Sequence, residues 1–146
     1  MGGAGQYASW MTGAMGRAME GQANKEDLAF QAEQARQNAL RSEVAAVDAE
    51  ERGAAEAAQI QSKGTQTIAT GRVATAASGI ELDSPTATRV AETTRAYATL
   101  DARTTKANAA REAWGYRQEG EQYKAAEKQY TKKSKSALTP WSVLFG

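Results

Sequence analysis

The chain has 146 residues and a net charge of +1, and it contains neither cysteine nor histidine. Its length fits one domain, and it lacks the residues needed for disulfides, thiolate or imidazole catalysis and most zinc sites. The near-neutral charge argues against free-standing nucleic-acid binding, which depends on clustered Lys and Arg.

The hydrophobic residues of the chain are mostly alanine, and few are large and aliphatic. There are 32 Ala but only 6 Leu, 3 Ile and 5 Val. Large aliphatic side chains supply most of the free energy of burial, so this set cannot build a thick globular core. Since Ala is the best helix former, we expect an elongated all-α protein, without a cofactor, whose remaining burial comes from partner subunits. A partly disordered chain is the alternative.

Two targeting features are missing from the sequence. It has no run of 18 apolar residues, so we expect no conventional transmembrane helix. Its N-terminus lacks the basic start and apolar centre of a signal peptide, so we expect no secretion by the general pathway.

Residues 1–23 form a glycine-rich segment. Six of the first twenty-one residues are Gly, and Trp10 and several Met lie among them. Glycine at this density weakens an isolated helix. We expect either a flexible leader or an adaptable interaction segment in which Trp10 contacts a protein or lipid surface.

Two helical arms follow, over about 24–78 and 85–131. Asn24 is placed to cap a first helix that begins at Lys25. Apolar and small residues then recur at steps of three and four, which is typical of one helical face. The second arm begins at Pro85 and carries a stripe whose period is close to 3.5, as in coiled coils.

The segment between the arms reads as a helix stop followed by a helix start. After Ser78, Gly79 supplies the left-handed C-terminal cap. Asp83 or Ser84 caps the next helix, and Pro85 fits its first turn. We therefore predict a hairpin whose tip spans residues 79–84.

Charge supports the hairpin. Residues 24–58 hold 4 basic and 8 acidic side chains, whereas residues 106–135 hold 8 basic and 4 acidic ones. Folding about residue 81 or 82 lays these stretches side by side, and it brings larger side chains to one predicted seam: Leu40, Val47, Ile68, Val73, Val90, Tyr97, Trp114 and Tyr123. One seam leaves the Ala-, Gln- and Thr-rich outer faces free, which favours a ring or bundle of identical subunits.

Residues 132–146 form a basic and then apolar tail. Its last part carries four large apolar side chains, Trp141, Val143, Leu144 and Phe145. They either fold back onto the hairpin, dock on another subunit or partner, or anchor at a membrane surface. We favour docking.

No catalytic or metal-binding constellation is evident. The carboxylates lie on charged helical faces, and the phosphate-binding spacing G-x-x-x-x-G-K-[ST] is absent. We expect no enzyme.

The tip and the second arm resemble a known family. The residues that carry the likeness are GRVATAASGIELDS at 71–84, the region 93–97, Asp101, Asn108-Ala109 and AWGY at 113–116. Over about residues 65–130 they are similar to the smaller internal virion proteins of short-tailed bacteriophages, also called internal core or ejection proteins. The resemblance implies a protein packaged near the portal with larger internal proteins and ejected ahead of the genome, which then helps form a conduit through the host envelope. It also implies association with the host outer membrane.

Three functions are therefore in view. The first is an internal virion protein that oligomerises and becomes part of the DNA-ejection channel, first inside the virion and then in the host envelope, with DNA only as cargo. The second is a static adaptor of a portal or tail complex that docks through its C-terminal tail. The third is a bacterial secreted helical effector or translocator.

Overall fold

The computed structural model describes residues 4–137, and it describes side chains from Met15 onward. It consists of two long helices, α1 (Ala4–Ala77) and α2 (Pro85–Ser136), which pack as a hairpin. The predicted all-α helical hairpin is therefore confirmed.

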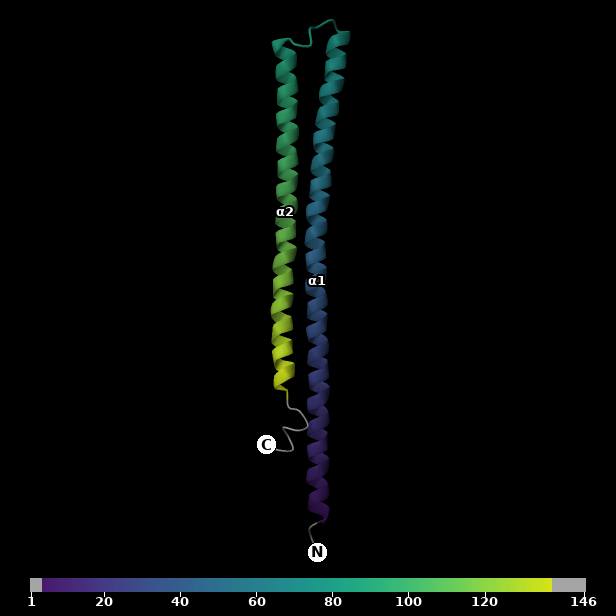
Figure 1. Cartoon of the computed structure of the whole chain (residues 1–146), viewed down its shortest axis with the longest axis vertical. Coiled ribbons are helices and arrows are strands. Elements are labelled where there is room, and N and C mark those ends of the chain that lie inside the picture. Colours follow the sequence, from purple (N-terminus) through teal and green to yellow (C-terminus); the bar gives the residue numbers. More distant parts are fainter. Residues whose placement is uncertain (1–3, 138–146) are drawn as a thin grey trace. The chain divides into compact units, whose positions relative to one another are not determined.

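The hairpin divides into two compact units, each built from part of both helices. Unit 1 contains the described residues up to Ser42 and from Gln118 onward. Unit 2 contains Glu43–Arg117 and includes the loop between the helices. In unit 2 the two helices run side by side in opposite directions and are joined by the teal loop in Figure 1.

Helix α1 ends in the manner predicted for Gly79. This residue has a φ of 73°, the left-handed conformation that glycine adopts without a steric penalty. The Gly79 amide donates to the carbonyl of Ala76 (3.1 Å) and the Ile80 amide to that of Thr75 (3.2 Å). These two bonds form a Schellman motif, which satisfies carbonyls left unpaired at a helix end.

Helix α2 begins at Pro85, as predicted, and Ser84 is its cap. The Ser84 hydroxyl accepts a hydrogen bond from the Ala87 amide at 3.3 Å, and the Ser84 carbonyl accepts one from Thr88 at 3.0 Å. The sequence left Asp83 and Ser84 open as caps; the geometry selects Ser84.

The prediction that the first helix begins at Lys25 is wrong, because α1 already begins at Ala4. Asn24 lies inside the helix and caps nothing. Side chains four residues apart bond across this region, Gln22 to Glu26 (3.4 Å) and Gln31 to Asp27 (2.9 Å). Without a proline to interrupt it, the segment continues the helix despite its glycines.

Helix α2 continues to Ser136, five residues beyond the predicted end of the second arm. Lys133 and Lys135 lie in its last turn, where positive charge complements the helix dipole. The hydroxyl of Ser134 donates to the Thr131 carbonyl (3.2 Å), so local hydrogen bonding also supports the final turn.

The seam between the helices is made of small residues. Among the described residues, no large side chain is fully buried. The buried apolar side chains there are all alanines: Ala32, Ala35, Ala39, Ala46, Ala49, Ala57, Ala102, Ala109 and Ala113. In unit 2, Ala46, Ala49 and Ala113 form a cluster against which Tyr116 packs. The hairpin is thus held by close backbone approach rather than by a core of large side chains.

The spacing of the buried positions differs between the units. In unit 1 they recur every seven residues, as at Ala32 and Ala39. In unit 2, from the middle of the helices toward the loop, they recur every eleven, as at Gly53 and Gly64 on α1 and at Ala102 and Ala113 on α2. Both spacings keep one face of each helix on its partner.

Candidate assembly surface

Most of the larger side chains predicted for the seam point away from it, and that prediction is wrong for six of the eight. The exposed ones are Leu40, Val47, Val73, Val90, Tyr97 and Trp114. Ile68 and Tyr123 are half-buried. The reason is steric, because helices that approach closely enough to bury alanines leave no space for bulky side chains between them.

Two glycines in unit 2 mark how close this approach is. A Cβ built on Gly53 would collide with the Cβ of Ala109, and one built on Gly64 would lie 2.6 Å from the Cβ of Ala98. Both pairs have residue numbers that add to 162, which defines the register of the hairpin in unit 2. In unit 1, Gly120 lies against Ser42 in the same register, although there a Cβ would meet Ser42 Cβ at 3.4 Å.

Ion pairs across the seam of unit 2 support this register. Arg117 bonds to Glu50 through Nη1 (2.7 Å) and lies 3.6 Å from Glu43, and Arg52 pairs with Glu112 at 3.1 Å. The hydrogen bond from Arg117 lowers the pKa of Glu50, and the same bond raises the pKa of Arg117. These exposed pairs select the alignment predicted from the charge pattern more than they stabilise it.

The outer face of α2 in unit 2 carries an exposed stripe, the α2 stripe. Its positions alternate steps of four and three: Thr93, Tyr97, Leu100, Thr104, Ala107, Arg111 and Trp114. Tyr97 and Trp114 are each 64% exposed and Leu100 is 58% exposed. This is the 3.5-residue pattern of a coiled-coil seam, yet none of these exposed positions belongs to the buried seam between the two helices.

The outer face of α1 in unit 2 carries a matching stripe, the α1 stripe. It follows the same alternation and consists of smaller side chains: Val44, Val47, Glu51, Ala54, Ala58, Gln61 and Thr65. All of these residues are exposed. Glu51 is the one charged residue of this stripe, as Arg111 is of the α2 stripe.

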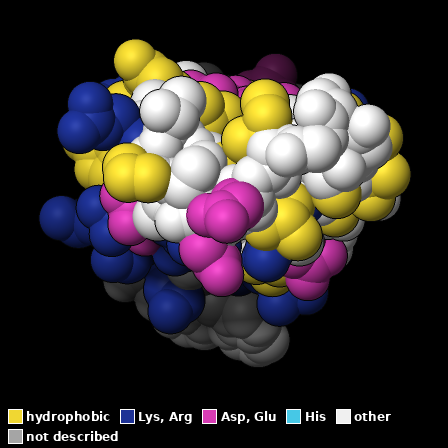
Figure 2. Space-filling model, turned by 90° about the horizontal axis from the view of Figure 1, so that it is seen from above, with side chains coloured by type: hydrophobic (Ala, Val, Ile, Leu, Met, Phe, Trp, Pro, Cys, Tyr) yellow, Lys and Arg dark blue, Asp and Glu magenta, His cyan; other side chains and the backbone are white. Residues whose placement is uncertain are grey.

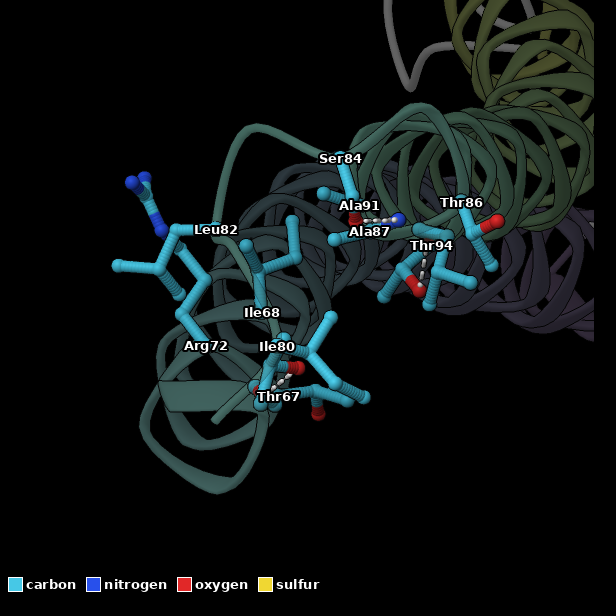
Figure 3. Close-up of a pocket in the computed structure, with 13 residues that line it drawn as sticks. Thr67, Ile68, Arg72, Ile80, Leu82, Ser84, Thr86, Ala87, Ala91 and Thr94 are labelled. Atoms are coloured by element: carbon cyan, nitrogen blue, oxygen red, sulfur yellow. Dashed lines mark hydrogen bonds between the residues drawn. The ribbon is translucent and has the colours of Figure 1, made fainter. Parts of the chain in front are cut away.

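A groove of about 530 Å³ lies between the helices next to the loop. Figure 3 shows Ile68 and Ile80 on its α1 side and Ala87 and Ala91 on its α2 side, while the Arg72 guanidinium extends away from α2. The α2 wall of the groove is formed by Thr86, Ala87, Val90, Ala91 and Thr94. Seen from the loop end, the surface carries many hydrophobic and uncharged side chains with acidic ones among them (Figure 2).

The predicted docking residues fall outside this description. The Trp10 side chain and residues 138–146, with Trp141, Val143, Leu144 and Phe145, lie beyond the described residues. Within the described part, no helix is long and apolar enough to cross a membrane. No group of three or more acidic residues is placed there to hold a metal ion.

No protein-family model matches this chain, and no curated protein or solved structure is similar enough to count as a match.

Proposed function

We propose that this chain is an internal virion protein of a short-tailed bacteriophage, which oligomerises and is ejected to help form the genome-delivery channel across the host envelope. The sequence resemblance at the tip and second arm motivates the phage assignment. One structural observation supports the assembly part: the larger apolar side chains of unit 2 face outward, while the hairpin closes on alanines.

The sizes of the buried and exposed side chains in unit 2 bear on assembly. A buried methyl or methylene group contributes about 0.8 kcal/mol, whereas burying a Leu or Val side chain contributes about 1.5–3 kcal/mol. Unit 2 leaves Leu100, Val90 and Trp114 exposed and buries alanines in their place. The apolar surface that remains is therefore available to neighbours, as expected of a subunit that is completed by assembly.

The ejection step is tested on particles. Quantitative mass spectrometry compares the copy number of this chain in intact phage particles with that in particles emptied of DNA. We expect the chain in intact particles and its loss from emptied ones. Equal amounts in both would indicate the static adaptor instead, and absence from intact particles would refute the virion assignment altogether.

The adaptor has a test of its own. If the chain is a fixed part of a portal or tail complex that docks through its C-terminal tail, deletion of residues 139–146 abolishes its incorporation into particles. The helicity of the purified chain in solution should then stay unchanged. Under the ejection proposal, copies that are incorporated leave the particle ahead of the genome.

A further inference from the structure

We propose that the α2 stripe of unit 2 binds the α1 stripe of a second copy of this chain, with the two helices antiparallel and in the register of the hairpin itself. These two stripes would form the contact between neighbouring copies. The proposal rests on the proposed function only in expecting that the chain associates with itself.

The pattern of the stripes identifies a helix as the partner. Side chains that recur every 3.5 residues form a continuous line only along another helix that winds around the first. Both outer faces of unit 2 have this spacing, and both are exposed over their whole length. One hairpin therefore carries two complementary halves of a helix–helix contact that it does not make within itself.

The register follows from symmetry. If copies stand side by side and point the same way around an axis, α2 of one copy meets α1 of the next at equal height. Residues that face each other then have numbers that add to about 162, as Gly53 and Ala109 do within the hairpin. This geometry makes a specific pairing that the sequence can support or contradict.

The charged members of the stripes support it. In this register Glu51 of one copy lies level with Arg111 of the next. Arg111 donates only to the neighbouring Asn108 on its own helix (2.8 Å), and Glu51 has no ion-pair partner among the described residues. Each is the single charged residue of its stripe. If the two pair, the contact does not bury an unpaired charge against apolar side chains.

Side-chain sizes also match in this register. Tyr97 lies level with Thr65 of the α1 stripe, and Leu100 lies level with Ser62, the neighbour of Gln61 in that stripe. Trp114 lies within one residue of the level of Val47. Large against small is the arrangement that fills the space between packed helices.

Net charge favours this pairing over α2 against α2. The α1 part of unit 2 (43–77) has five acidic and three basic residues, whereas the α2 part (85–117) has six basic and three acidic ones. A contact between two α2 helices would place like charges together, whereas α2 against α1 places opposite charges together. The contact is then head-to-tail and repeats from copy to copy, which closes a ring where the rotation allows.

Cysteine cross-linking tests the contact, since the chain has no cysteine of its own. Val47→Cys and Gly115→Cys are placed at the same level on the two outer faces, and the space beside Gly115 is open. A mixture of the two single variants, oxidised mildly, should give a disulfide-linked dimer of one of each. A double variant that carries both cysteines in one chain should give a ladder of disulfide-linked oligomers.

The matched control mixes Val73→Cys with Gly115→Cys. Val73 is 70% exposed on α1, but its level differs from that of Gly115, so no dimer is expected. Dimers from either single variant alone would show a symmetric contact and overturn the proposal. A chain that sediments as a monomer and gives no cross-link would also overturn the proposal. That outcome counts against self-association even if the chain binds lipid vesicles.

Charge reversal provides a second measurement. Glu51→Arg and Arg111→Glu should each weaken self-association by on the order of tenfold, and the double variant should restore it. Lys63→Glu changes charge outside both stripes and should leave association unchanged. Failure of the double variant to recover would overturn the predicted pairing, while the particle experiment on ejection would remain unaffected.

Discussion

Replacing Gly53 with Ala tests whether the backbones in unit 2 approach as closely as the geometry indicates. The new methyl group would collide with the Cβ of Ala109, which is fixed to the backbone and cannot rotate away. At Gly71 and Gly115 the same substitution meets open space. The three positions lie inside helices, so they differ mainly in what the added methyl group contacts.

The magnitudes separate the two outcomes. Gly→Ala in an exposed helix interior stabilises by about 0.5–1 kcal/mol, because Ala loses less backbone entropy on folding. Overpacking a close contact costs about 1–3 kcal/mol. We therefore expect Gly71→Ala and Gly115→Ala to raise the free energy of unfolding. Gly53→Ala should lower it, or at best leave it unchanged.

The assay is urea unfolding followed by circular dichroism at one protein concentration, with the association state of each variant checked by sedimentation. The double variant Gly53→Ala/Ala109→Gly moves the glycine from one helix to the other and removes the collision. It should return to within about 1 kcal/mol of the original chain, because one Gly→Ala gain offsets one Ala→Gly loss. If Gly53→Ala stabilises as much as Gly71→Ala, the close approach is refuted.

Three further predictions concern the charge pair and the loop. Glu50→Gln should lower the free energy of unfolding at pH 7. Because Arg117 lowers the pKa of Glu50 in the folded chain, this loss should shrink as pH falls through that lowered pKa; a loss that stays constant over that range would contradict the pairing. Ser84→Ala removes the α2 cap and should cost about 1 kcal/mol in urea unfolding; no change would refute its capping role. Gly79→Ala forces a side chain into the left-handed region and should cost about 1–2 kcal/mol; a rise in melting temperature would contradict the observed φ.

Much of the fold could be predicted from the sequence because its signals are local. The left-handed cap at Gly79 and the helix start at Pro85 depend on single residues with narrow conformational preferences. The alignment of the arms depends on the numbers of charges in each, and Arg117 with Glu50 shows that this reasoning holds in unit 2.

The faces of the helices were harder to assign. The sequence contains two stripes on α2, one small and one large, and hydrophobicity favours the stripe that contains Leu100 and Trp114. Close packing instead selects the stripe that contains Ala109, since only small side chains fit between backbones this near. The clue in the sequence was the eleven-residue spacing of Gly53 and Gly64 on α1, which matches that of Ala98 and Ala109 on α2.

The helix ends were misplaced for a different reason. The glycines near the N-terminus lower helix propensity by about 1 kcal/mol each, but none of them stops a helix as proline does. At the other end, the sequence pattern around Thr131 and Ser134 suggests a polar tail. The Ser134 hydroxyl instead donates to the Thr131 backbone carbonyl inside the last turns of α2.

The change from a seven-residue to an eleven-residue spacing has a consequence for handedness. A seven-residue repeat makes two helices coil to the left, and an eleven-residue repeat makes them coil to the right. Each unit thus sets its own sense of winding about its own seam. The stripes on the outer faces of unit 2 recur every 3.5 residues, so a helix added there would coil to the left while the seam of the same unit coils to the right.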